Sequence, residues 1–135
     1  MEFTIDRETV LEGVQKTLGI VERKTTLPIL NNVLVRAERG QIKLMATDRE
    51  IGLVTRYDAD VAVEGDITLS ARKFSEMLRE LQGEQILFRR QENNQVLITC
   101  GKVVYRIPGV PADDFPRVVF DESMRIDPVQ SRLLK

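Results

Sequence analysis

Apolar and polar residues alternate along this chain in a pattern that opens the same way three times. These openings cover residues 3–6, 67–70 and 124–127, and each ends in a residue suited to cap a helix. Such a stretch predicts a β-strand that leads directly into a helix. The first two openings continue in full, whereas the chain ends at Lys135, inside the expected third helix. We therefore expect the chain to be a fragment of a longer protein.

Two amphipathic helices are expected after the first two openings. Asp6 caps the first and Ser70 caps the second, and in both the apolar residues recur at the spacing of a helix. The apolar stripes consist of Val10, Leu11, Val14 and Leu18 in the first helix and of Phe74, Met77, Leu78 and Leu81 in the second. Each helix therefore has one face to bury.

Three further strands are expected after each helix, with Gly, Asn or Asp at the turns. They cover residues 33–35, 42–46 and 51–54 in the first unit, and 86–88, 96–100 and 103–107 in the second. Both units read β-α-β-β-β. Because one such unit cannot bury its own apolar faces, the two should pack together, with the helices side by side on a curved antiparallel sheet.

The fold class is therefore α+β, and the expected domain covers residues 1–120. Residues 121–135 would be a linker and the truncated start of a second domain. The segment 108–116 contains three prolines, and we expect it to lead out of the first domain.

Composition narrows the possible functions. The net charge is −1 and 30% of the residues are charged, so the chain as a whole has no electrostatic attraction to nucleic acid. It has no histidine and one cysteine, Cys100, which argues against a metal site and predicts no cofactor. The pattern lacks a signal peptide and any run of about 20 apolar residues, so we expect a cytoplasmic protein with no membrane partner.

Catalytic motifs are absent from the sequence, and we predict no catalytic residues. Asp48, Glu50 and the pair Asp113-Asp114 are conceivable as a carboxylate site. Asp48 lies in an expected turn and the pair lies between prolines, where aspartate bonds the local backbone, so the structural interpretation is favoured. Cys100 closes an apolar strand and is expected in the core.

Basic residues gather near the two helices. They are Arg23 and Lys24 after the first helix, and Arg72, Lys73 and Arg79 along the second. Adjacent helices would present them on one outer face, which suits contact with phosphates. Acidic residues are interspersed among them, and from the charge pattern alone a solvated surface is favoured.

Five short segments resemble one known family. They are MEFTI at 1–5, TLPIL at 26–30, ATDRE at 46–50, ARKF at 71–74 and PADDFP at 111–116. In this order they closely resemble the N-terminal domain of the bacterial DNA polymerase III beta subunit, the sliding-clamp family. The resemblance covers residues 1 to about 120, and the rest resembles the start of the family's second domain.

The resemblance implies the DNA-clamp fold, with three duplicated domains in each chain. Two chains close head to tail into a homodimer ring with helices lining the hole, through which duplex DNA threads. The implied function is that of a non-catalytic processivity factor, which tethers the replicase through phosphate contacts without sequence preference. DNA polymerase III and the clamp loader would bind the domains absent here, so this chain alone should neither close a ring nor recruit a polymerase.

Individual residues take roles from the same resemblance. Lys24 and Arg72 fall where the family has cations facing DNA, and the resemblance moves the interpretation of Arg23 and Arg79 toward DNA contact as well. The implied ring interface consists of Lys73, Met77, Lys102, Tyr105 and Ile107. Val104 departs from the family, since some relatives carry a cation there. The helix pattern places Met77 in the core instead, and both interpretations stay open.

Two alternatives to the ring subunit remain open. The chain could be a single-domain relative of the family that self-associates through Tyr105 and Ile107. It could also be a truncated product without a function of its own.

Overall fold

The computed structural model describes residues 1–21, 31–47 and 51–116. The elements, in order, are β1 (Glu2–Asp6), α1 (Arg7–Val21), β2 (Asn32–Glu38), β3 (Gln41–Thr47), β4 (Gly52–Asp58), β5 (Asp60–Val63), β6 (Gly65–Ser70), α2 (Ala71–Glu80), β7 (Gln85–Arg90), β8 (Gln95–Cys100), β9 (Val103–Pro108) and a short 3-10 helix (Ala112–Asp114). The third opening and the expected boundary near residue 120 lie outside the described residues.

Both helices begin at the predicted caps. The Asp6 carboxylate accepts hydrogen bonds from the backbone N–H of Thr9 at 3.1 Å and from its hydroxyl at 3.0 Å. The Ser70 hydroxyl accepts one from the N–H of Lys73 at 3.3 Å. These bonds satisfy N–H groups that a first helical turn leaves without a partner.

The strands form two antiparallel sheets, and the two repeat units exchange their first strands between them. One sheet has the order β5-β1-β7-β8-β9 and the other the order β4-β3-β2-β6. The first strand of each unit therefore pairs with the other unit: β1 lies beside β7, and β6 lies beside β2. The α+β class and the antiparallel pairing are confirmed, whereas the division into two sheets and the exchange were not predicted.

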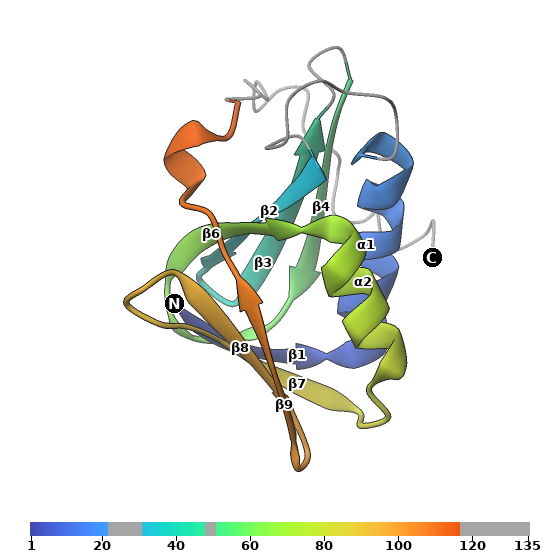
Figure 1. Ribbon diagram of the computed structural model, residues 1–135, viewed down its shortest axis with the longest axis vertical. Helices are drawn as coiled ribbons and strands as arrows, with labels where there is room; N and C mark the ends of the chain where they lie inside the picture. Colours follow the sequence, from blue (N-terminus) through green and yellow to red (C-terminus); the bar gives the residue numbers. More distant parts are fainter. Residues whose placement is uncertain (22–30, 48–50, 117–135) are drawn as a thin grey trace.

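The core lies between the helices and the two sheets. Figure 1 shows α1 and α2 together on one side of the molecule, and the two helices contact each other as predicted. Phe3 of β1 stacks on Phe88 of β7 with ring centroids 4.6 Å apart, and Phe74 of α2 meets the same ring at 6.1 Å. Aromatic packing therefore joins residues of both units.

The buried face of α1 is rotated relative to the prediction. Leu11 and Leu18 are only partly buried, whereas Gly13 and Thr17 are buried. A Cβ added to Gly13 would lie 2.6 Å from both Leu44 Cδ1 and Tyr57 Cε2. The glycine thus allows α1 to approach β3 and β4 closely, and the helix turns that side toward the sheet.

The segment 108–116 was expected to lead out of the domain. Instead, it packs back onto it. Thr68 in β6 and Val110 exchange two backbone hydrogen bonds of 2.9 Å each, and Gly109 donates to the carbonyl of Asn94. Phe115 is buried. This apolar side chain and the bonds to β6 explain why a proline-rich segment remains part of the domain.

Candidate nucleic-acid and ring-interface surfaces

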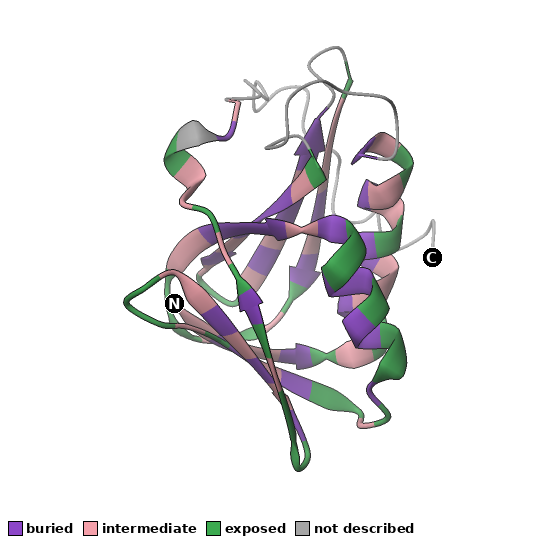
Figure 2. Ribbon diagram, viewed as in Figure 1, coloured by how far each residue is buried: buried purple, intermediate pink, exposed green. Residues whose placement is uncertain are grey.

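The outer face of α2 carries the basic residues that the sequence singled out. Arg72, Lys73 and Arg79 are exposed there, because the apolar stripe of the helix faces the core and leaves the charged positions outside (Figure 2). Glu76 and Glu80 are exposed on the same helix. The surface is therefore mixed in sign, with three cations and two carboxylates.

Arg72 also lines a hollow of about 250 Å³ between the last turns of α1 and the first turn of α2. Among the described residues, Leu18, Val21, Asn31 and Ser70 also line it. A guanidinium beside the positive end of a helix dipole favours a negatively charged group. Arg23 and Lys24, the other two cations expected to face DNA, lie outside the described residues.

The strand β9 forms one edge of the five-stranded sheet and carries two of the residues expected in the ring interface, Tyr105 and Ile107, while a third, Lys102, comes directly before it. Lys102, immediately before the strand, is exposed, Tyr105 is partly exposed, and Ile107 is buried. Val103 and Val104 are 48% and 57% exposed. An edge strand with exposed valines is suited to pairing with another chain.

Tyr105 is held against the end of α2. Its hydroxyl donates a hydrogen bond to Glu80 Oε2 at 2.8 Å. This bond to the carboxylate stabilises the protonated phenol and so raises the pKa of Tyr105. The sequence could not predict the contact, because the two residues are 25 positions apart on different elements.

Met77 and Ile107 are each only 5% exposed and belong to the hydrophobic core. The prediction of Met77 as a core residue, made from the helix pattern, is confirmed. The ring-interface roles of both residues stay predictions, as do those of Lys73, Lys102 and Tyr105.

Arg106 is an exposed cation on β9 that the predicted interface does not include. It lies two residues after Val104, the position at which the sequence was expected to depart from relatives that carry a cation, and alternation along β9 puts both on the same face of the sheet. The alternation of residues along this strand could have identified Arg106 from the sequence. This edge therefore keeps a basic residue close to the position that Val104 leaves apolar.

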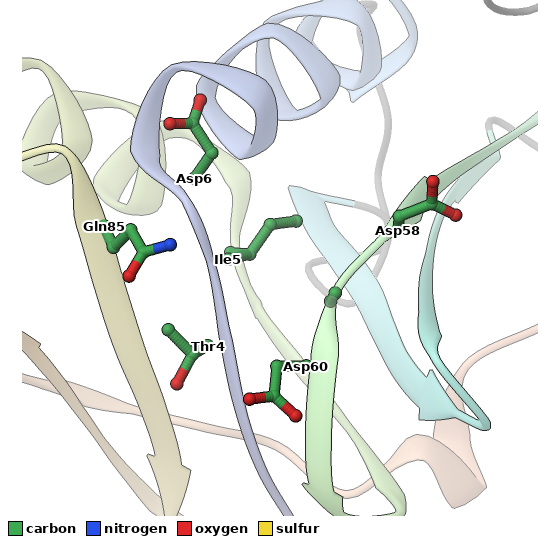
Figure 3. Close-up of a pocket in the computed structure, with 7 residues that line it drawn as sticks. Thr4, Ile5, Asp6, Asp58, Asp60 and Gln85 are labelled. Carbon is green, nitrogen blue, oxygen red and sulfur yellow. The ribbon is translucent and has the colours of Figure 1, made fainter.

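Of the candidate carboxylates, the structure describes only the side chain of Asp113. Asp48 and Glu50 lie outside the described residues, and Asp113 is exposed. A separate open hollow of about 390 Å³ includes Asp6, Asp58 and Asp60, but their carboxylates do not converge on one point (Figure 3). Within the described ranges, no three His, Cys, Asp or Glu side chains are grouped to hold a metal ion.

Two further findings bear on the expected chemistry. Cys100 is buried, as predicted. Of the helices in the described part of the chain, none has the length and apolar character needed to cross a bilayer.

The sequence of this domain is similar to that of known proteins. The family model described as "DNA polymerase III beta subunit, N-terminal domain" matches residues 1–119. The chain belongs to this family. The beta sliding clamp of Pseudomonas aeruginosa is 40% identical over 119 residues, which are 87% of this chain and 32% of that protein. A beta sliding clamp of Vibrio harveyi is 33% identical over 119 residues, which cover 82% of its sequence.

Solved structures of the family have the same fold. The DNA polymerase III subunit beta from Pseudomonas aeruginosa superposes with a TM-score of 0.80 at 38% identity, over 87% of this chain and 32% of that one. The DNA polymerase sliding clamp from Bacillus subtilis gives a TM-score of 0.84 at 27% identity, over 87% of this chain and 33% of that one. The chain thus spans about a third of the length of these clamps, and the resemblance and clamp fold expected from the sequence are confirmed.

Proposed function

We propose that this chain is the N-terminal domain of a ring-shaped processivity factor that encircles duplex DNA and tethers the bacterial replicase. The observation that carries this proposal is the family match over residues 1–119. The pair of adjacent helices supports it, because a layer of helices can face a phosphate backbone without reading base edges. The role is not catalytic, and it belongs in the cytoplasm, where bacterial DNA is replicated.

The proposed DNA contacts are electrostatic. Arg72 and Arg79, exposed on α2, contact phosphates together with Arg23 and Lys24. Each phosphate contact releases condensed counterions, which makes the slope of log K against log salt steeper, that is more negative, by about 0.9 for duplex DNA. Contacts of this kind carry no sequence preference, and the clamp can therefore slide.

A matched pair of double variants tests these contacts. We expect the double variant Arg72→Ala with Arg79→Ala to bind DNA more weakly, and by the same factor on unrelated sequences. The magnitude of its salt slope should fall by about one to two. Arg39→Ala with Arg89→Ala removes the same charge from residues outside the helices. An equal loss in both double variants would assign the effect to net charge and refute the assignment of the contacts to α2.

The ring interface in this proposal is formed by Lys73, Met77, Lys102, Tyr105 and Ile107, which meet a second clamp chain. In the full-length clamp of this proposal, the domains beyond this one supply the other half of the interface. They also supply the cleft that binds DNA polymerase III and the clamp loader. A primer-extension assay with the replicase tests the whole proposal. We expect the native protein to lengthen the products made in one binding event, and unchanged product lengths would refute it.

Self-association of a single-domain relative through Tyr105 and Ile107 is the second candidate. The observation that favours it is the exposed pair Val103 and Val104 on the edge strand β9. The mass of the denatured chain, measured together with the native mass, separates the candidates, because the ring is built from chains of three domains and the self-associated form from chains of one domain. A native assembly whose chains each have the mass of a single domain would replace the first proposal with this one.

A further inference from the structure

Tyr105 is the most exposed of the three apolar residues expected in the ring interface. Met77 and Ile107 are each 5% exposed, whereas Tyr105 is partly exposed and packs against the core. Tyrosine is enriched among the residues that dominate binding at protein interfaces. The direction in which this ring is held therefore matters for any chain that docks here.

Glu80 fixes that direction. It is the last residue of α2, and its Oε2 atom accepts the hydrogen bond of 2.8 Å from the Tyr105 hydroxyl. The end of the helix is itself fixed, because the N–H of Leu81 donates to the carbonyl of Met77. The bond therefore joins the edge strand β9 to a rigid point on α2.

A second chain that docks on this side meets α2 and β9 together. The two elements are joined through β7 and β8, which run between them in the chain. A hydrogen bond directly between them holds the phenol in one orientation before docking. Holding a side chain in its bound orientation removes part of the entropy cost of binding.

We propose that Glu80 is a positioning residue of the ring interface, which holds the Tyr105 ring in the orientation that a second chain of the same protein binds. This inference rests on the proposed function. It adds Glu80, an acidic residue, to an interface whose expected charged members are Lys73 and Lys102.

The expected effect follows from the loss of one hydrogen bond and one ordered side chain. Glu80→Ala leaves the phenol without its partner, and Tyr105→Phe keeps the ring but removes the hydroxyl. Each should raise the Kd of self-association of the full-length native protein by roughly two- to tenfold per interface. Because both remove the same bond, the double variant should be no weaker than the weaker single variant.

Glu76→Ala is the matched control, since Glu76 is exposed one turn earlier on the same helix. We expect it to associate like the wild type. Glu80→Gln keeps an oxygen that can accept the hydroxyl, and it should recover part of the affinity. Equal weakening by Glu76→Ala and Glu80→Ala, or no recovery in Glu80→Gln, would show an effect of charge alone and overturn the inference.

A second readout follows the contact itself. The pKa of Tyr105, measured by NMR of its ring carbons, should fall toward the ordinary value in Glu80→Ala and stay raised in Glu76→Ala. An unchanged pKa in Glu80→Ala would overturn the inference. If the native protein is a monomer, the ring proposal itself fails; if it associates and Glu80→Ala associates as tightly, only the role of Glu80 fails.

Discussion

Arg7 links the start of α1 to the end of α2, and its replacement tests how the two repeat units are held together. Its Nε donates to the carbonyl of Gly83 at 2.8 Å, and its Nη1 donates to the carbonyl of Leu78 at 3.0 Å. The side chain is 16% exposed. The last carbonyls of a helix lack partners within the helix and attract cations through the helix dipole. Arg7 therefore satisfies one carbonyl in the last turn of α2, that of Leu78, and one in the loop that follows the helix, that of Gly83.

Arg7→Met keeps an unbranched apolar stem about as long as the methylene part of arginine but removes the guanidinium and with it both donors. A hydrogen bond to a charged group contributes about 1.5–3 kcal/mol, but water can reach part of this site, so the two bonds together should contribute about 2–3 kcal/mol. The ion pair with Glu8 adds little, since it is 3.8 Å long and Glu8 is 84% exposed. We expect the free energy of unfolding to fall by that 2–3 kcal/mol, which corresponds to a decrease in Tm of about 10 °C.

Urea denaturation followed by far-UV circular dichroism measures this change. Glu8→Gln is the control, because it removes the surface ion pair and leaves both carbonyl contacts in place. We expect it to lie within about 0.5 kcal/mol of the wild type. A similarly small change in Arg7→Met would refute the claim that this side chain stabilises the end of α2.

Two further substitutions test the packing of the helices by the same urea assay. Gly13→Ala should lower the free energy of unfolding by about 1–3 kcal/mol, because the new Cβ would lie 2.6 Å from Leu44 and Tyr57; no loss would contradict the close approach of α1. Gly19→Ala is its control and should gain up to about 1 kcal/mol of stability, since no atom of the described residues lies within 4 Å of the added Cβ. Ser75→Ala should gain about 1 kcal/mol, because among the described residues this buried hydroxyl has no hydrogen-bond partner; a loss would indicate a partner there.

The sequence predicted the elements of this fold better than their pairing. Caps at Asp6 and Ser70 and the stripe of α2 are local features, and each is confirmed. Alternation along a strand shows that one face is buried but not which strand lies alongside. The exchange of β1 and β6 between the units therefore left no signal in the pattern. The short strand β5 was missed for a related reason, since its pairing with β1 defines it.

The candidate surfaces were likewise predictable only in part. The exposure of Arg72, Lys73 and Arg79 follows from helical periodicity and could be predicted. The burial of Ile107 and the bond between Tyr105 and Glu80 depend on how β9 packs beside α2. Local pattern fixes which residues face outward, whereas tertiary packing decides which of them touch.

Retention on circular DNA tests the central claim most directly. A ring that encircles duplex DNA is held by topology, so the native protein, once loaded on a closed circle, should stay bound at salt concentrations that abolish phosphate contacts. Cutting the circle once should release it, because the ring slides off the free ends. Release at the same rate from cut and closed circles would show ordinary electrostatic binding and contradict the account.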